Sequence, residues 1–171
     1  EYGAHCAENV ARAVRTAGGA SMDAFSIHPY RYPRPPEESD LTGELVRILE
    51  AAAKEGAPRR MWITEIGWPT HAGQGGVDGR TQAHFAVRAL ALLQACEGVE
   101  KVHWYDFKDD GLERVYNEHN FGVVHHQSLN CAPKPAAVSM AVYQRLTAGA
   151  RPAGLTVEGG VYTVRFRRPD G

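Results

Sequence analysis

The sequence predicts an α/β protein built from consecutive strand–helix units. Three short apolar segments, 23–30, 61–70 and 99–107, have the composition of buried strands, and stretches with helical spacing of apolar residues lie between them. Each strand segment also carries polar or aromatic side chains at its carboxyl end, where parallel α/β proteins place their functional residues. These observations together favour a parallel sheet with helices along the chain between its strands.

The first unit pairs a short strand with an amphipathic helix. The strand segment 23–30, DAFSIHPY, ends in His28 and Tyr30 and follows a helix-like stretch over residues 7–14. Asp40 is placed to cap the next helix, and Gly56 lies just past its end. The apolar positions of this helix fall at i, i+4, i+7, i+8 and i+11, namely Leu41, Leu45, Ile48, Leu49 and Ala52.

The second strand segment holds the most informative ten residues of the chain. The segment 61–70, MWITEIGWPT, is an apolar run that carries Glu65 near its end and then breaks into a Gly-Trp-Pro turn. Burying a carboxylate costs several kcal/mol unless it is paired or hydrogen-bonded. Glu65 therefore indicates either a pocket at this point or a salt bridge to an arginine in the loop.

The third strand segment follows another helix. That helix is closed by Gly98, and the strand 99–107, VEKVHWYDF, ends in Trp104 and Asp106. The apolar face of the helix is formed by Ala83, Val87, Leu90 and Leu93.

The last part of the sequence predicts a further helix followed by a β-hairpin. Pro133 and Pro135 lead into a helix over about residues 134–147. Beyond it, the sequence LTVEGGVYTVRF alternates apolar and polar residues around Gly159–Gly160, which predicts a β-hairpin. The expected organisation is therefore an α/β part over residues 1–149 and a hairpin within residues 150–171.

Five motifs in this order resemble the last third of a clan-A retaining glycoside hydrolase, and most closely the family-39 and family-5 enzymes. The resemblance runs from about Ala7 to Thr147. It implies the C-terminal portion of a (β/α)8 TIM barrel, about strands 6–8 with their helices, and it implies that the hairpin starts an accessory β-domain. The motifs are IHPY, ITEIGW, HWYDF, FGVV at 121–124 and PKPAA at 133–137.

The same resemblance implies roles for four residues. Glu65 would be the nucleophile at the end of strand seven, and Tyr30 on strand six would hydrogen-bond it. His28 would line the substrate cleft, and Trp104 on strand eight would form an apolar floor under the sugar. A retaining enzyme of this kind hydrolyses a glycosidic bond, here expected to be β-linked, by double displacement.

Two further residues are expected to contact the substrate. Trp68 suits a sugar cleft because a flat apolar ring stacks on the C–H side of a pyranose, although packing in the core is an equal alternative. Asp106 begins the charged loop into which strand eight opens, and such loops set substrate selectivity in barrels. For this loop, solvated surface charges are an equal alternative.

Length limits what this chain does alone. A complete barrel takes ~250 residues, and this chain has 171, so the first four or five strand–helix units are expected upstream. By the resemblance, the general acid/base is a glutamate in an Asn-Glu pair on strand four, and Glu8–Asn9 has the reverse order on a helix-like stretch. We therefore expect the missing N-terminal part of the barrel to be the required partner, and residues 1–171 alone to be inactive. Any signal peptide would lie in that part, so the compartment is undetermined.

Composition excludes several other classes of protein. The 19 basic and 20 acidic residues nearly balance, so the sequence offers no electrostatic field for nucleic acid or an anionic membrane. No apolar run approaches the ~20 residues of a membrane span. The histidines between 103 and 126 match no metal-ligand spacing, so we expect no metal and no cofactor. Three cysteines predict no disulfide framework.

Two alternatives to the glycosidase differ from it in class. One is a non-catalytic carbohydrate-binding barrel that has lost its chemistry, which the residue at the strand-four position would reveal. The other is a small complete α/β domain unrelated to sugars, and the exposed edges of a three-stranded parallel sheet argue against it. The glycosidase hypothesis predicts a parallel sheet with the Glu65 strand in the middle. It also predicts that Glu65, Tyr30 and Trp104 converge on one concavity.

Overall fold

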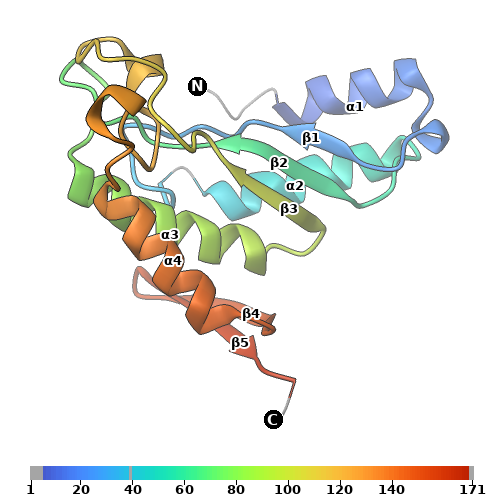
Figure 1. The fold of residues 1–171 in the computed structure, drawn as a ribbon. Coiled ribbons are helices and arrows are strands. Elements are labelled where there is room, and N and C mark those ends of the chain that lie inside the picture. Colours follow the sequence, from blue (N-terminus) through green and yellow to red (C-terminus); the bar gives the residue numbers. More distant parts are fainter. Residues whose placement is uncertain (1–5, 39, 170–171) are drawn as a thin grey trace.

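A parallel β-sheet carries the helices of this chain on one of its faces (Figure 1). The computed structural model describes residues 6–38 and 40–169. Short 3-10 turns occur at Gly19–Ser21, Asn117–Asn120 and Gln127–Leu129. The helices and strands are α1 (Cys6–Ala17), β1 (Phe25–Ile27), α2 (Leu41–Lys54), β2 (Met61–Ile66), α3 (Gly79–Ala95), β3 (Val99–Trp104), α4 (Pro135–Thr147), β4 (Arg151–Glu158) and β5 (Val161–Arg167).

The sheet has the strand order β1-β2-β3, and all neighbouring pairs are parallel. In β1 and β2, Phe25 pairs with Met61 and Ile27 with Ile63. This topology confirms the prediction that the Glu65 strand lies in the middle. Because the strands are parallel, their carboxyl ends meet at one edge of the sheet, where the loops after all three strands come together.

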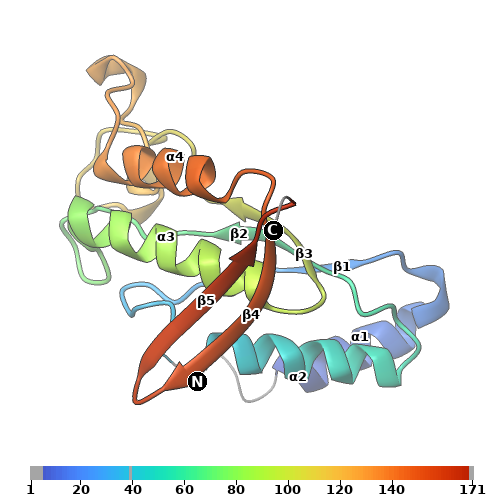
Figure 2. The same cartoon turned by 90° about the horizontal axis from the view of Figure 1, so that it is seen from below.

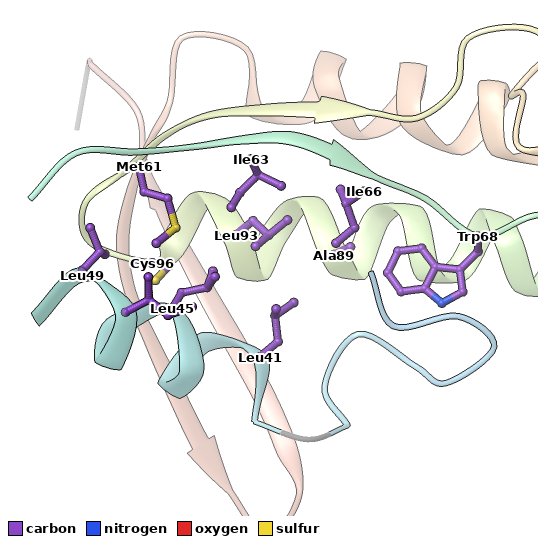
Figure 3. Packing of buried hydrophobic residues seen from close by; sticks show 11 residues of the cluster. Leu41, Leu45, Leu49, Met61, Ile63, Ile66, Trp68, Ala89, Leu93 and Cys96 are labelled. Carbon is purple, nitrogen blue, oxygen red and sulfur yellow. The ribbon is translucent and has the colours of Figure 1, made fainter. Parts of the chain in front are cut away.

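The core lies between the sheet and two of the helices. Figure 3 shows Met61, Ile63 and Ile66 of β2 pointing toward α2 and α3. Each of these side chains is fully buried, and complete burial of such a side chain stabilises the fold by about 1.5–3 kcal/mol. The helices contribute further buried side chains to this cluster, namely Leu41, Leu45, Ile48 and Leu49 from α2, and Ala89 and Leu93 from α3.

Two irregularities interrupt the register between β2 and β3. Ile63 pairs with Val102 and Ile66 with Trp104, so between these two pairs β2 contains one residue more than β3. Such a bulge places two successive side chains on the same face of the sheet. A second irregularity lies between the pairs that Met61 and Trp62 make with β3.

Side-chain caps set the starts of the two central helices. The Asp40 carboxylate accepts a hydrogen bond from the Gly43 N–H at 3.2 Å, which confirms the predicted cap of α2. Asp78 accepts hydrogen bonds from the N–H groups of Arg80 and Thr81, both at 2.8 Å. This second cap starts α3 one turn earlier than the apolar spacing indicates.

The tail forms the predicted hairpin. Strands β4 and β5 are antiparallel and meet at Gly159 and Gly160, whose φ angles of 55° and 80° are those of a two-residue turn that favours glycine. Phe166 packs edge-on against Tyr143 of α4 with ring centroids 6.2 Å apart. Figure 2 shows the hairpin lying beside α3 and α4, so it does not stand alone in solvent. Within the described part of the chain, no helix is long and apolar enough to cross a membrane.

Candidate active site

Glu65 lies at the carboxyl end of the central strand, on the face of the sheet turned away from α2 and α3. Strict alternation would place it on the same face as Met61 and Ile63, inside the helical layer. The bulge between Ile63 and Ile66 changes this outcome, because it lets Thr64 and Glu65 share the open face while Ile66 returns to the core. The Glu65 side chain is 35% exposed, so its carboxylate is accessible.

Two side chains from the end of β1 contact the Glu65 carboxylate. The Tyr30 hydroxyl donates a hydrogen bond to Glu65 Oε2 at 2.9 Å, which confirms the predicted contact. The Nδ1 atom of His28 lies 3.4 Å from the same oxygen, and its Nε2 atom lies 2.9 Å from Thr64 Oγ1. The contacts from Tyr30 and His28 thus converge on Oε2 and leave Oε1 on the other side of the carboxylate.

The Tyr30 hydroxyl is held in its protonated form. Burial raises the pKa of Tyr30 above its ordinary value, and the hydrogen bond to Glu65 and the Glu65 charge raise it further. A phenol that stays protonated remains a hydrogen-bond donor to the Glu65 carboxylate.

An aromatic cluster fixes the Tyr30 ring. Its centroid lies 5.6 Å from that of Tyr32, 5.8 Å from that of Phe121 and 6.4 Å from that of Tyr105, all in edge-on arrangements. Phe121 is fully buried and also contacts Tyr32 and Tyr105. The ring that positions the hydroxyl therefore has little freedom to move.

Both tryptophans that were expected to contact sugar belong to the helical side of the sheet. Trp68 is fully buried, stacks on Trp104 with centroids 5.9 Å apart, and donates its indole N–H to the Arg34 carbonyl. Trp104 also packs against a cluster that includes Ala83 and Ala136, and its Nε1 atom is buried. The burial of Trp68 supports the alternative of core packing for this residue, and a contact of its ring with substrate stays a prediction. The predicted convergence of Trp104 with Glu65 and Tyr30 is wrong, because side chains alternate and Trp104 follows its partner Ile66 into the core.

Tyr105 occupies the place expected for Trp104. It is the next residue along the chain, so alternation turns it to the open face, where its ring lies beside Tyr30. Its hydroxyl donates a hydrogen bond to Glu118 Oε2 at 3.2 Å. Burial, and after it the charge of Glu118, raise the pKa of Tyr105 to about 12. The signal for this position is present in the sequence, since Val102 and Trp104 are apolar in alternation and assign Tyr105 to the opposite face.

Asp106 lies in the loop after β3, with its backbone pinned to a neighbouring segment. Its N–H donates to the Phe121 carbonyl, and its carbonyl accepts from the Val123 N–H. Its carboxylate accepts a hydrogen bond from the N–H of Phe107. The carboxylate is therefore engaged with its own loop, and a contact with substrate stays a prediction.

A second polar cluster lies further along the same loop. Lys134 and Asp109 are buried and form an ion pair at 2.6 Å, and the Lys134 ammonium also donates to Thr70 Oγ1 at 2.9 Å. His125 Nδ1 lies 3.4 Å from the other oxygen of Asp109. These residues border a cavity of about 440 Å³ that does not include Glu65. Within residues 6–38 and 40–169, no group of three or more histidine, cysteine or acidic side chains is arranged to hold a metal ion.

Comparisons with known proteins bear on the family and the fold of this chain. A family described as glycosyl hydrolase catalytic core matches residues 4–129. The structure is similar to that of a family 39 glycoside hydrolase from the gut symbiont Bacteroides cellulosilyticus WH2, with a TM-score of 0.79 and 23% identity over 99% of this chain and 36% of that one. The chain thus spans about a third of that relative. No curated protein sequence matches this chain.

Two other solved structures are similar at lower scores. A family 17 β-1,3-glucanosyltransferase from Rhizomucor miehei gives a TM-score of 0.53 at 16% identity, over 77% of this chain and 55% of that one. A GH2 β-galacturonidase from Eisenbergiella tayi, bound to galacturonate, gives a TM-score of 0.53 at 21% identity, over 72% of this chain and 24% of that one. At these identities the likeness concerns the fold alone.

Proposed function

Because this chain belongs to the glycosyl hydrolase catalytic core family, we propose that it supplies the nucleophile of a retaining glycosidase that cleaves β-linked glycosides. The observation that carries the proposal is the accessible Glu65 carboxylate at the carboxyl end of the central strand, with the Tyr30 hydroxyl 2.9 Å from one of its oxygens. The chain would form the last three strand–helix units of a (β/α)8 barrel.

The proposed reaction has two steps. In the first, Glu65 Oε1 attacks the anomeric carbon, the bond to the leaving oxygen breaks, and a second carboxylic acid protonates that oxygen. In the second, that residue takes a proton from water, the water oxygen attacks the anomeric carbon, and Glu65 is released. Tyr30 holds Oε2 throughout, so it directs the other oxygen toward the sugar.

The acid/base residue would come from the part of the barrel upstream of these 171 residues. Retaining enzymes hold their two carboxyl groups about 5–5.5 Å apart, and the resemblance of the motifs assigns the partner to strand four. We propose that the full-length protein joins both halves in one site, with His28 and Asp106 lining the cleft beside Glu65.

A carbohydrate-binding barrel without chemistry has less support. Such a module would use exposed aromatic platforms, and Trp68 and Trp104 both pack on the helical side. Stacking of aromatic rings on a sugar does not need an accessible carboxylate such as that of Glu65. Nucleophilic attack on the anomeric carbon does need one.

The test is substitution of the nucleophile in the full-length protein. Glu65→Ala should lose nearly all hydrolysis of an aryl β-glycoside. Azide should restore part of the release of the aryl group and yield a glycosyl azide of inverted (α) configuration, because the vacated space admits an external nucleophile. Rates and the anomeric configuration of the product by NMR check both points. Glu50→Ala, at an exposed carboxylate of α2, is the control. Undiminished hydrolysis by Glu65→Ala would end the assignment.

A further inference from the structure

A second tyrosine–carboxylate pair stands next to the first. The Tyr105 hydroxyl donates to Glu118 as the Tyr30 hydroxyl donates to Glu65, at 3.2 and 2.9 Å. The two tyrosine rings are edge-on with centroids 6.4 Å apart. The charge of Glu118 also contributes to the raised pKa of Tyr30, so this carboxylate acts electrostatically on the group that holds the nucleophile.

The Glu118 carboxylate retains acceptor capacity. Oε2 accepts from Tyr105, and Oε1 accepts from the Asn117 side-chain amide at 3.0 Å. A carboxylate offers about four lone-pair sites, so about two remain for other donors. Among the described residues, no lysine, arginine or histidine forms a salt bridge with Glu118. The side chain is half-buried, and such a charge gains from further hydrogen-bond donors.

The turn that carries Glu118 is held from several directions. The Asn120 amide donates to the carbonyls of Glu113 and Tyr116 at 2.9 and 2.7 Å. The Asn120 carbonyl accepts from the Thr70 N–H at 2.9 Å, which ties this turn to the loop after β2. A carboxylate that is already fixed in position loses little conformational entropy when a ligand binds, so it can discriminate between ligands.

We propose that Glu118 is a specificity-determining residue, which accepts hydrogen bonds from the hydroxyl groups of a neutral sugar unit held over Glu65. The inference rests on the proposed function and names its substrate class. A sugar hydroxyl is a good donor to a carboxylate, whereas a uronic acid would bring a third negative charge beside Glu65 and Glu118. The site therefore selects neutral β-glycosides against β-uronides.

The experiment uses the full-length protein with two pairs of 4-methylumbelliferyl substrates, the β-glucoside with the β-glucuronide and the β-galactoside with the β-galacturonide. Each pair differs only at C6. Wild type should prefer the neutral member of a pair. Glu118→Gln should lower kcat/KM for that member about tenfold or more, chiefly through KM, because a hydrogen bond to a charged group is lost. The preference over the uronide should narrow, since one repelling charge is gone.

Two companion variants make the result specific. Tyr105→Phe keeps the ring and the Glu118 charge but releases the carboxylate, so it should raise KM for the neutral substrate by a smaller factor. Glu113→Gln, at an exposed carboxylate of the same loop, should leave KM and the preference unchanged. If Glu118→Gln does not fold, as judged by circular dichroism, Tyr105→Phe tests the proposal instead. A raised KM for the neutral substrate would support the role of Glu118, and an unchanged KM would overturn it.

The outcomes separate this inference from the proposed function. A wild-type preference for uronides, or an equal fall for both members of a pair in Glu118→Gln, would overturn the role of Glu118. In either case, loss of activity in Glu65→Ala would still uphold the nucleophile. Absence of hydrolysis by wild type on all four substrates would overturn the neutral substrate class proposed here, whereas activity in Glu65→Ala equal to that of wild type would overturn the nucleophile itself.

Discussion

In the proposed reaction, the Tyr30 hydroxyl leaves one oxygen of the Glu65 carboxylate available to attack. It donates to Oε2, and His28 approaches the same oxygen. The ring of Tyr30 packs edge-on against the rings of Tyr32, Tyr105 and Phe121. The Tyr30 ring therefore fixes the position of the hydroxyl, and the hydroxyl hydrogen-bonds the Glu65 carboxylate. A substitution that removes only the hydroxyl separates these two contributions.

Tyr30→Phe should lower kcat of the full-length protein about 10–100-fold with little change in Tm, because it removes one hydrogen bond to a charged group and keeps the ring packing. Steady-state kinetics on an aryl β-glycoside and a thermal melt measure both effects. Tyr32→Phe, in the same aromatic cluster, serves as the control. Equal activity losses in the two variants would show that the Tyr30 hydroxyl has no special part in the reaction.

At the scale of single residues, the sequence predicts chemistry better than orientation. The hydrogen bond between Tyr30 and Glu65 is implied by the resemblance of the motifs to the glycoside hydrolases, and the structure contains it. The misplaced Trp104 shows the limit, because Tyr105, the residue just after β3, takes the position beside Tyr30, and a shift by one residue exchanges the two faces of a sheet. Aromatic character alone does not distinguish a sugar platform from core packing.

Strand β2 shows why elements are predicted better than their irregularities. Its apolar composition and its central position follow from the sequence. Its bulge does not, because the bulge depends on the register with Val102 and Trp104 of the neighbouring strand. Without it, Glu65 would share the face of Met61 and Ile63. The feature that exposes the carboxylate is thus a property of the strand pair.

The cap of α3 permits a prediction with a pH dependence. The Thr81 N–H, then the Thr81 hydroxyl, hold the pKa of Asp78 below its ordinary value of 3.8. A lowered folded-state pKa contributes stability that is present above the ordinary pKa and lost as pH falls through the folded value. Asp78→Ala should therefore lower Tm by a few degrees at pH 7, and the difference should shrink as pH falls below 3.8.

Thermal melts of both proteins between pH 7 and pH 2 test the cap of α3. Asp23→Ala removes an exposed aspartate outside any helix and should leave Tm nearly unchanged. A Tm difference for Asp78→Ala that persists undiminished at the lowest pH would contradict the electrostatic account and leave only helix propensity to explain it.

At the scale of the whole molecule, the helices cover one face of the sheet and the other face carries polar and aromatic groups. On that second face, the Lys101 ammonium lies 3.8 Å from the centroid of the Trp62 ring, and the Trp62 N–H donates to Glu100 at 3.1 Å. The outer edges of β1 and β3 have no strand partner among the described residues. The order and direction of the strands could be predicted from the sequence. The position of the hairpin against α4 could not, because it depends on tertiary contacts such as that of Phe166 with Tyr143.

Residues 1–171 produced alone should show no glycosidase activity and should self-associate, because open strand edges pair with other copies and one carboxylate cannot fill two catalytic roles. Size-exclusion chromatography with light scattering and an aryl β-glycoside assay measure the two properties. The full-length protein, assayed beside it, is the control. A monomeric, cooperatively melting and active preparation would show that this chain is a complete enzyme.

The stacked indoles of Trp68 and Trp104 give the molecule a built-in optical reporter. Their rings are 5.9 Å apart with an interplanar angle of 27°, close enough for their electronic transitions to couple in circular dichroism. One indole follows β2 and the other ends β3, so the coupled signal exists only while those strands are paired. The chain's three tryptophans all lie between residues 62 and 104, and the hairpin has none. Fluorescence and dichroism at indole wavelengths therefore report on the sheet and the helices packed against it, whereas the hairpin contributes no indole signal.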